Sequence, residues 1–218
     1  MSLLPYLEVE PQQPATASVI WLHGLGADGH DFEPIAKELN LPDSLAIRFI
    51  FPHAPSMPVT INNGMVMPAW YDVLGAAIDD VIDIKGIKHS AEKINLLIEQ
   101  EISRGISSDR IILAGFSQGG AVAYECALSY PKKLGGLMAL STYYATHQQI
   151  QLSAINKDIP ILVCHGSDDA VVAESLAHRA IKRLEDKAYR VEYKSYPMQH
   201  NVCIEEIDDI SMWLQKIL

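Results

Sequence analysis

Residues 110–131, RIILAGFSQGGAVAYECALSYP, decide the fold that we expect for this chain. An apolar run from Ile111 predicts a buried strand, and a Gly-Phe-Ser-Gln-Gly turn centred on Ser117 follows it. Beyond the turn, apolar residues recur at helical spacing until Pro131. A strand, a sharp turn and a helix in this order lift a serine hydroxyl clear of a sheet, next to backbone N–H groups at the helix start. The stretch therefore predicts a nucleophilic serine.

The same residues exclude a phosphate-binding loop. Gly115 and Gly120 fit its GxxxxG spacing, but Ala121 and Val122 occupy the positions where such a loop needs Lys and Ser or Thr.

A second glycine-rich stretch, residues 23–29 (HGLGADG), follows a predicted strand at 18–22. Its glycines fit the dinucleotide fingerprint GxGxxG, which would favour a nicotinamide or flavin oxidoreductase. That fingerprint needs an acidic residue about 20 positions later, and residues 46–54 (AIRFIFPHA) contain none. The next helix is also expected only from about Asp31. We interpret the stretch as a loop that supplies one backbone N–H to an oxyanion hole, with the Gln118 N–H as the second donor.

Composition bounds the class of protein. A chain of 218 residues suits one domain, and a formal charge of −10 without a basic cluster argues against nucleic acid as a partner. We see no segment apolar enough to span a bilayer and no secretory signal, so we expect a cytoplasmic location. Three widely spaced cysteines, Cys126, Cys164 and Cys203, argue against a disulfide framework or a zinc site. We expect neither a metal nor a cofactor.

Strand-like and helix-like segments alternate along the chain. This alternation predicts an α/β fold with a mostly parallel sheet flanked by helices on both faces. The expected strands are residues 7–10, 18–22, 46–51, 111–114, 136–140, 160–164 and 190–196. The expected helices are 31–39, 90–104, the segment between the Ser117 turn and Pro131, 171–185, and a closing helix that contains Ile207, Ile210, Leu214 and Ile217. The polar stretch between residues 141 and 157 is left unassigned.

The long segment at about 55–83 is rich in Pro, Gly, Asn and Met and is expected to be irregular. Met65, Trp70, Tyr71 and Leu74 would give it an apolar surface. This surface could bind an acyl chain, or it could be a lid that only covers the core. An apolar loop of this kind could also make transient contact with acylated or lipid surfaces, or join two copies in a homodimer.

A serine hydroxyl needs a base, and histidine suits this task. Only His178 and His200 follow the candidate acids in the hydrolase order Ser, Asp, His. His178 falls on the polar face of a predicted helix, whereas His200 follows the last strand, at the same sheet edge as Ser117. We therefore choose His200. Asp168 and Asp169 both follow the strand at 160–164, and spacing alone leaves the choice between them open.

The motifs HGLGADG, FPHAP, MPAWYD, GFSQGG, HGSDDAVV and QHNV, in this chain order, resemble the acyl-protein thioesterase and carboxylesterase family of α/β-hydrolases from about residue 18 to the C-terminus. The resemblance implies Asp169 as the acid beside Ser117 and His200, and Leu25 and Gln118 as the oxyanion donors. It also implies that Trp70 and Tyr71 face the substrate. The chain departs from the family at Ala170, where proline is usual after the acid.

The sequence thus predicts a cofactor-free serine hydrolase that cleaves carboxylic esters or thioesters of small molecules, acylated proteins or lipids through an acyl-enzyme. The same triad would also serve a lysophospholipase. A hydrolase-fold protein that binds ligand without catalysis is the remaining alternative.

Overall fold

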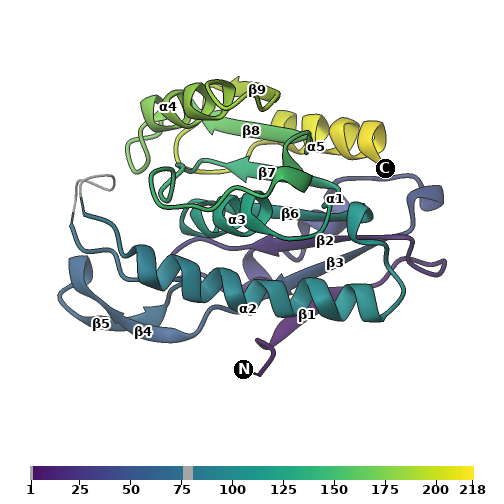
Figure 1. Cartoon of the computed structure of the whole chain (residues 1–218), viewed down its shortest axis with the longest axis horizontal. Helices are drawn as coiled ribbons and strands as arrows, with labels where there is room; N and C mark the ends of the chain where they lie inside the picture. The colour runs from purple at the N-terminus through teal and green to yellow at the C-terminus, as the bar shows by residue number, and fades with distance from the viewer. Residues whose placement is uncertain (1, 76–80) are drawn as a thin grey trace.

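A computed structural model describes residues 2–75 and 81–218, and in this part of the chain seven strands form one twisted sheet in the order β1-β3-β2-β6-β7-β8-β9 (Figure 1). Only β1 runs antiparallel to its neighbour; the other pairs of adjacent strands are parallel. The strands are β1 (Tyr6–Val9), β2 (Ala17–Leu22), β3 (Ile47–Pro52), β6 (Ile111–Phe116), β7 (Gly136–Leu140), β8 (Ile161–Gly166) and β9 (Val191–Tyr196). The mostly parallel α/β sheet that the sequence predicts is confirmed.

Helices cover both faces of this sheet, because its central strands are apolar on both sides. In β2, Ile20 and Leu22 pack into one core and Val19 and Trp21 into the other. The first core includes buried residues of α2 (Ile84–Ser103), α3 (Gln118–Ser129) and α4 (Glu174–Glu185). The second includes residues of α1 (Ile35–Glu38) and α5 (Ile204–Ile217). In Figure 1, α2 crosses in front of the sheet, with β1 at the bottom and β9 at the top.

The helix predicted at 90–104 begins six residues earlier, at Ile84. The Asp83 side chain caps it by accepting a hydrogen bond from the Gly86 N–H at 2.9 Å. Ser90, a residue type that often caps helices, instead lies inside the helix, where its hydroxyl donates to the Trp70 carbonyl. At the other end Gly105 adopts a φ of +98°, as a glycine that follows a helix end commonly does.

Two other predicted helices are shorter than expected. The segment 31–39 forms only a 3₁₀ turn, η1 (Gly29–Asp31), and the single-turn α1, and α4 starts at Glu174 rather than at 171. Pro34 limits the first of these, since it cannot donate a backbone hydrogen bond.

The segment at 55–83, predicted to be irregular, contains an antiparallel hairpin of β4 (Ser56–Val59) and β5 (Met65–Pro68). The two strands are joined through Asn63 and Gly64, which both have a positive φ. Residues 76–80 of this segment lie outside the described residues. No helix within residues 2–75 and 81–218 is long and apolar enough to cross a bilayer.

Candidate active site

Ser117 stands between β6 and α3 in a strained backbone conformation, with φ of +53° and ψ of −120°. Three hydrogen bonds hold this conformation. The Ser117 N–H donates to Leu140 O at 2.9 Å, and the Ser117 carbonyl accepts from the Gly120 N–H at 3.0 Å and from the Thr142 hydroxyl at 2.6 Å. A positive φ at a non-glycine residue costs about 1–3 kcal/mol and is often found at functional sites.

The glycine at position 119 lets α3 begin directly behind the serine. A Cβ atom at this position would lie 2.5 Å from His23 O and 2.6 Å from Leu22 O, both of them backbone atoms. Only glycine allows the helix to approach the end of β2 this closely.

His200 and Asp169 reach Ser117 from the ends of β9 and β8. His200 Nε2 lies 2.9 Å from Ser117 Oγ, and His200 Nδ1 lies 2.7 Å from Asp169 Oδ2. A carboxylate only accepts hydrogen bonds, so His200 donates through Nδ1 and keeps the Nε2 lone pair for the serine proton. The Phe116 ring packs against the imidazole at a centroid distance of 4.7 Å and helps to fix its plane. The geometry matches a nucleophile, a base and an orienting acid.

Burial distinguishes Asp169 from Asp168, the two candidate acids between which the sequence spacing could not decide. Asp169 is buried, and its Oδ1 accepts from the Val171 and Val172 N–H groups at 2.9 and 2.8 Å. Asp168 is exposed, and among the described residues its side chain makes no hydrogen bond. Ala170 stands where proline is usual, and the turn still presents both amides to the carboxylate.

The two predicted oxyanion donors both border the cavity at Ser117. Gln118 is the first residue of α3, where backbone N–H groups have no partner within the helix. The Leu25 N–H makes no hydrogen bond within residues 2–75 and 81–218. The Gly26 N–H donates to Pro68 O at 2.9 Å, which ties this loop to β5. Two unsatisfied amides beside the serine are the arrangement that an acyl oxyanion requires.

The Gln118 side chain has a structural role that the sequence did not suggest. Its Oε1 accepts from the Trp70 N–H at 2.9 Å and its Nε2 donates to the Tyr71 carbonyl at 2.7 Å. The Trp70 indole in turn donates to the His23 carbonyl at 2.8 Å. These bonds clamp the segment at 70–71 against the loop at 23–29 and the start of α3.

Two buried histidines support the same loops. His23 accepts the Ala54 N–H at Nε2, 3.1 Å away, and its Nδ1 lies 2.7 Å from Gly24 O. His165 donates from Nε2 to Val172 O at 2.7 Å. Burial lowers the pKa of both rings and keeps them neutral. Their roles became visible only when the fold brought these loops together. His178, the alternative base, instead lies on the exposed side of α4, near Glu174.

A cavity of about 490 Å³ opens above Ser117 and His200. Its walls are largely apolar and include Ile61, Tyr71, Val73, Phe116, Tyr143 and Val172. Of the four residues predicted to bind substrate, Tyr71 lines the cavity and Trp70 is buried behind it. Met65 and Leu74 are 63% and 40% exposed and lie outside the cavity wall.

Comparison of the sequence and the structure with known proteins shows the family of this chain. The sequence matches the phospholipase/carboxylesterase family over residues 6–218. It is 37% identical over 238 residues to acyl-protein thioesterase 1 of Cryptococcus neoformans, covering 99% of this chain and 98% of that protein. The structure is similar to acyl-protein thioesterase 2 of Zea mays, with a TM-score of 0.87, 30% identity and coverage of 97% and 98%. It is also similar to SOBER1 of Arabidopsis thaliana, with a TM-score of 0.86, 32% identity and coverage of 92% and 98%. The chain belongs to the phospholipase/carboxylesterase family of α/β-hydrolases and is a carboxylic ester hydrolase.

Proposed function

We propose that the chain is a serine hydrolase that cleaves carboxylic esters or thioesters through an acyl-enzyme formed on Ser117. The observation that carries this proposal is the unbroken series of hydrogen bonds from Asp169 through His200 to Ser117 at the base of an apolar cavity.

Acylation begins when Ser117 Oγ attacks the carbonyl carbon of the substrate. The serine proton passes to His200 Nε2, and the carbonyl electron pair moves onto oxygen. The N–H groups of Leu25 and Gln118 stabilise this oxyanion, and loss of one such donor typically costs about 3–4 kcal/mol of transition-state stabilisation. The tetrahedral intermediate then collapses and expels an alkoxide or thiolate, which takes the proton from His200. Asp169 accepts the Nδ1–H hydrogen bond throughout and holds the imidazole in one tautomer.

Deacylation repeats these steps with water. His200 removes a proton from a water molecule, whose oxygen attacks the acyl carbon of the ester on Ser117. Collapse of the second intermediate releases the carboxylic acid, and His200 returns the proton to Ser117 Oγ. The cycle consumes one water molecule and needs no cofactor.

The cavity walls support an acyl chain as the part of the substrate that is recognised. Tyr71, Val73 and Phe116 offer apolar surface directly beside Ser117, and a volume of about 490 Å³ is in the range of small-molecule sites. Two relatives are named acyl-protein thioesterases, which favours an acylated protein as the substrate of this chain. A lysophospholipid is the alternative, because it presents a similar acyl carbonyl to the same groups.

The β4–β5 hairpin supports contact with such substrates from outside the cavity. Met65 and Val66 at its tip are 63% and 64% exposed, and Ile61 borders the cavity. We include this hairpin, with Trp70 and Leu74 in the segment that follows it, in the substrate-covering part of the chain.

The test is intact mass after incubation with a fluorophosphonate, followed by peptide mapping. We expect one adduct, on Ser117, and loss of p-nitrophenyl butyrate hydrolysis in Ser117→Ala. Asp169→Asn should lower kcat by about 10⁴-fold, whereas the matched variant Asp168→Asn should stay near the wild-type rate. Rates on an S-palmitoylated peptide and on lysophosphatidylcholine then separate the two substrate classes. A folded protein without an adduct on Ser117 would instead favour a hydrolase-fold protein that only binds ligand.

A further inference from the structure

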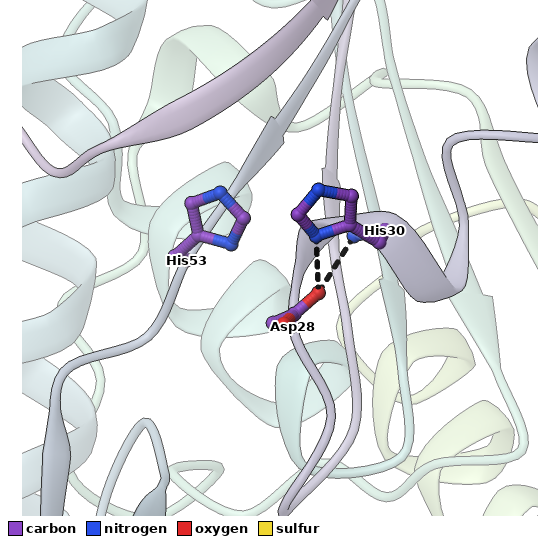
Figure 2. Close-up of side chains that lie close together, drawn as sticks. All are labelled: Asp28, His30 and His53. Atoms are coloured by element: carbon purple, nitrogen blue, oxygen red, sulfur yellow. Dashed lines mark hydrogen bonds and ion pairs between the residues drawn. The ribbon is translucent and has the colours of Figure 1, made fainter.

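Two histidines and an aspartate that the proposed reaction does not use lie together beside the oxyanion loop (Figure 2). Asp28 is the N-cap residue of η1, His30 lies within η1, and His53 directly follows β3. One potential ligand atom from each residue lies within 4.8 Å of the other two. The two imidazole rings have a centroid distance of 5.5 Å. Among the residues that the structure describes, this is the group of three or more His, Cys, Asp or Glu side chains that is close enough to hold one ion.

The hydrogen bonds of Asp28 already arrange two of the three side chains. Asp28 Oδ1 accepts from the His30 backbone N–H at 2.8 Å and from His30 Nδ1 at 2.9 Å (Figure 2). Asp28 Oδ1 and His30 Nδ1 are thus already adjacent, and both can bind one ion once the ring proton moves to Nε2, which has no partner in the described part of the chain.

The third side chain, His53, has a competing bond. The Gly29 N–H donates to His53 Nδ1 at 3.1 Å, so in the metal-free protein the proton of this ring is on Nε2. A metal ion that binds Nδ1 displaces this hydrogen bond directly, and one that binds Nε2 requires the ring proton to move to Nδ1, which also breaks the bond. The exchange is favourable for an ion that binds imidazole well, because one such hydrogen bond contributes only about 1 kcal/mol to stability.

The donor atoms select the ion. Two imidazole nitrogens and one carboxylate oxygen form the three-ligand set that Zn²⁺ accepts, with its fourth position open to water. Ligand atoms around tetrahedral Zn²⁺ lie roughly 3.4 Å apart, so the cluster must contract by about an ångström. His30 and Asp28 can move this far at little cost, since their side chains are 67% and 49% exposed.

We propose that Asp28, His30 and His53 form a reversible binding site for a divalent transition-metal ion, with Zn²⁺ as the expected ion. The ion joins the turn at 28–31 to the segment after β3. The same two segments frame the proposed oxyanion loop, because the Ala54 N–H donates to His23 and Gly29 contacts His53. Occupancy of the site therefore stabilises the loop that carries Leu25.

The test is calorimetric titration of the full chain, freed of metal by a chelator, with Zn²⁺, and Co²⁺ absorption to report coordination geometry. We expect one bound ion per chain and a tetrahedral Co²⁺ spectrum. His30→Gln and His53→Gln should each weaken binding by at least about tenfold. Both variants should fold, because His30 is exposed and a glutamine at 53 can still accept the Gly29 N–H.

The matched controls are His178→Gln and His89→Gln. Each of these exposed histidines has one carboxylate neighbour, at 3.8 Å for Glu174 and 3.7 Å for Glu92, and neither belongs to a described three-residue cluster. They should leave the affinity unchanged. The proposal is wrong if the wild-type chain takes up no Zn²⁺, or if the control variants weaken binding as much as His30→Gln and His53→Gln.

Discussion

Replacing Gln118 by methionine should destabilise the protein, although Met is similar in length and keeps the backbone N–H in place. The Gln118 side chain is buried, with 4% exposure, and it pairs with the Trp70 N–H and the Tyr71 carbonyl. Both of these residues are themselves 2% exposed, so water cannot replace the lost partner. Gln118→Met therefore leaves two buried backbone groups unsatisfied.

The expected size of this effect follows from the two lost bonds. An unsatisfied buried polar group costs about 1–3 kcal/mol, and the more favourable transfer of Met into the core offsets part of the sum. We expect a loss of about 3 kcal/mol in the free energy of unfolding. With an m-value of about 2 kcal/mol/M, the urea midpoint should fall by roughly 1.5 M.

The assay is equilibrium urea unfolding followed by tryptophan fluorescence. Gln215→Met is the matched control, because this glutamine is exposed and makes one side-chain hydrogen bond, to Ser211 Oγ at 3.2 Å. Its effect should stay within about 0.5 kcal/mol. Equal midpoints for the two variants would refute the clamp that we assign to Gln118.

Three further changes test other parts of the structure. Arg48→Met should cost about 2 kcal/mol in urea unfolding, because it removes the 2.9 Å partner of the fully buried Glu101 carboxylate and leaves this carboxylate to the more exposed Arg104 at 3.0 Å; a loss below 1 kcal/mol would contradict this. Burial raises the pKa of Glu206 from 4.5 to about 8 in the folded protein. The stability that the protein gains from keeping this carboxyl neutral is therefore fully present below pH 4.5 and is lost as the pH rises through 8. The free energy of unfolding of Glu206→Gln, relative to that of wild type, should thus increase by up to about 1.4 kcal/mol per pH unit across this interval. A difference in unfolding free energy that does not change with pH would argue against a buried neutral acid. Gly119→Ala should lower stability by about 3 kcal/mol, since its Cβ would meet backbone oxygens at 2.5 and 2.6 Å. Gly75→Ala, with nothing within 4 Å, should leave the Tm nearly unchanged.

The central strands could be predicted from sequence because burial on both faces leaves a direct signal. β2, β3, β6, β7 and β8 are almost continuously buried, and their sequences are correspondingly apolar. The start of α2 could not be found this way. Its first turn includes Lys85 and Gly86, which do not follow a helical apolar pattern, and its cap is an aspartate in a segment with several acidic residues.

The hairpin at 56–68 was missed although the sequence contains a signal for it. Asn63 and Gly64 form the type of pair that favours a tight turn between two strands. Prolines at positions 58 and 68 argued against strands, but β4 and β5 pair only with each other, and their free edges tolerate a residue without an N–H.

The order and the strand ends of Ser117, the 168–169 pair and His200 could be read from the sequence, because chain order and sheet edge are properties of the fold class. The choice of Asp169 over Asp168 came from the family resemblance. The contacts that hold the loops of the site in place could not be read from the sequence. The Gln118 clamp spans 48 residues of sequence and the His53 contact with Gly29 spans 24, and neither follows a local pattern. Such contacts depend on how two loops meet after the strands have been placed.

These loop contacts explain how a strained serine can be held in one position. The left-handed backbone at Ser117 would relax if β6 and α3 could separate, because no side chain of its own caps the turn. Leu140 O and the Thr142 hydroxyl hold its backbone from β7 and the loop after it. Ser141, between them, also has a positive φ of 45°. The strain is therefore shared by two neighbouring strand ends that fix each other. In the reaction that we propose, a serine held in this way needs little reorganisation before attack, which is the contribution that a rigid sheet edge can make to catalysis.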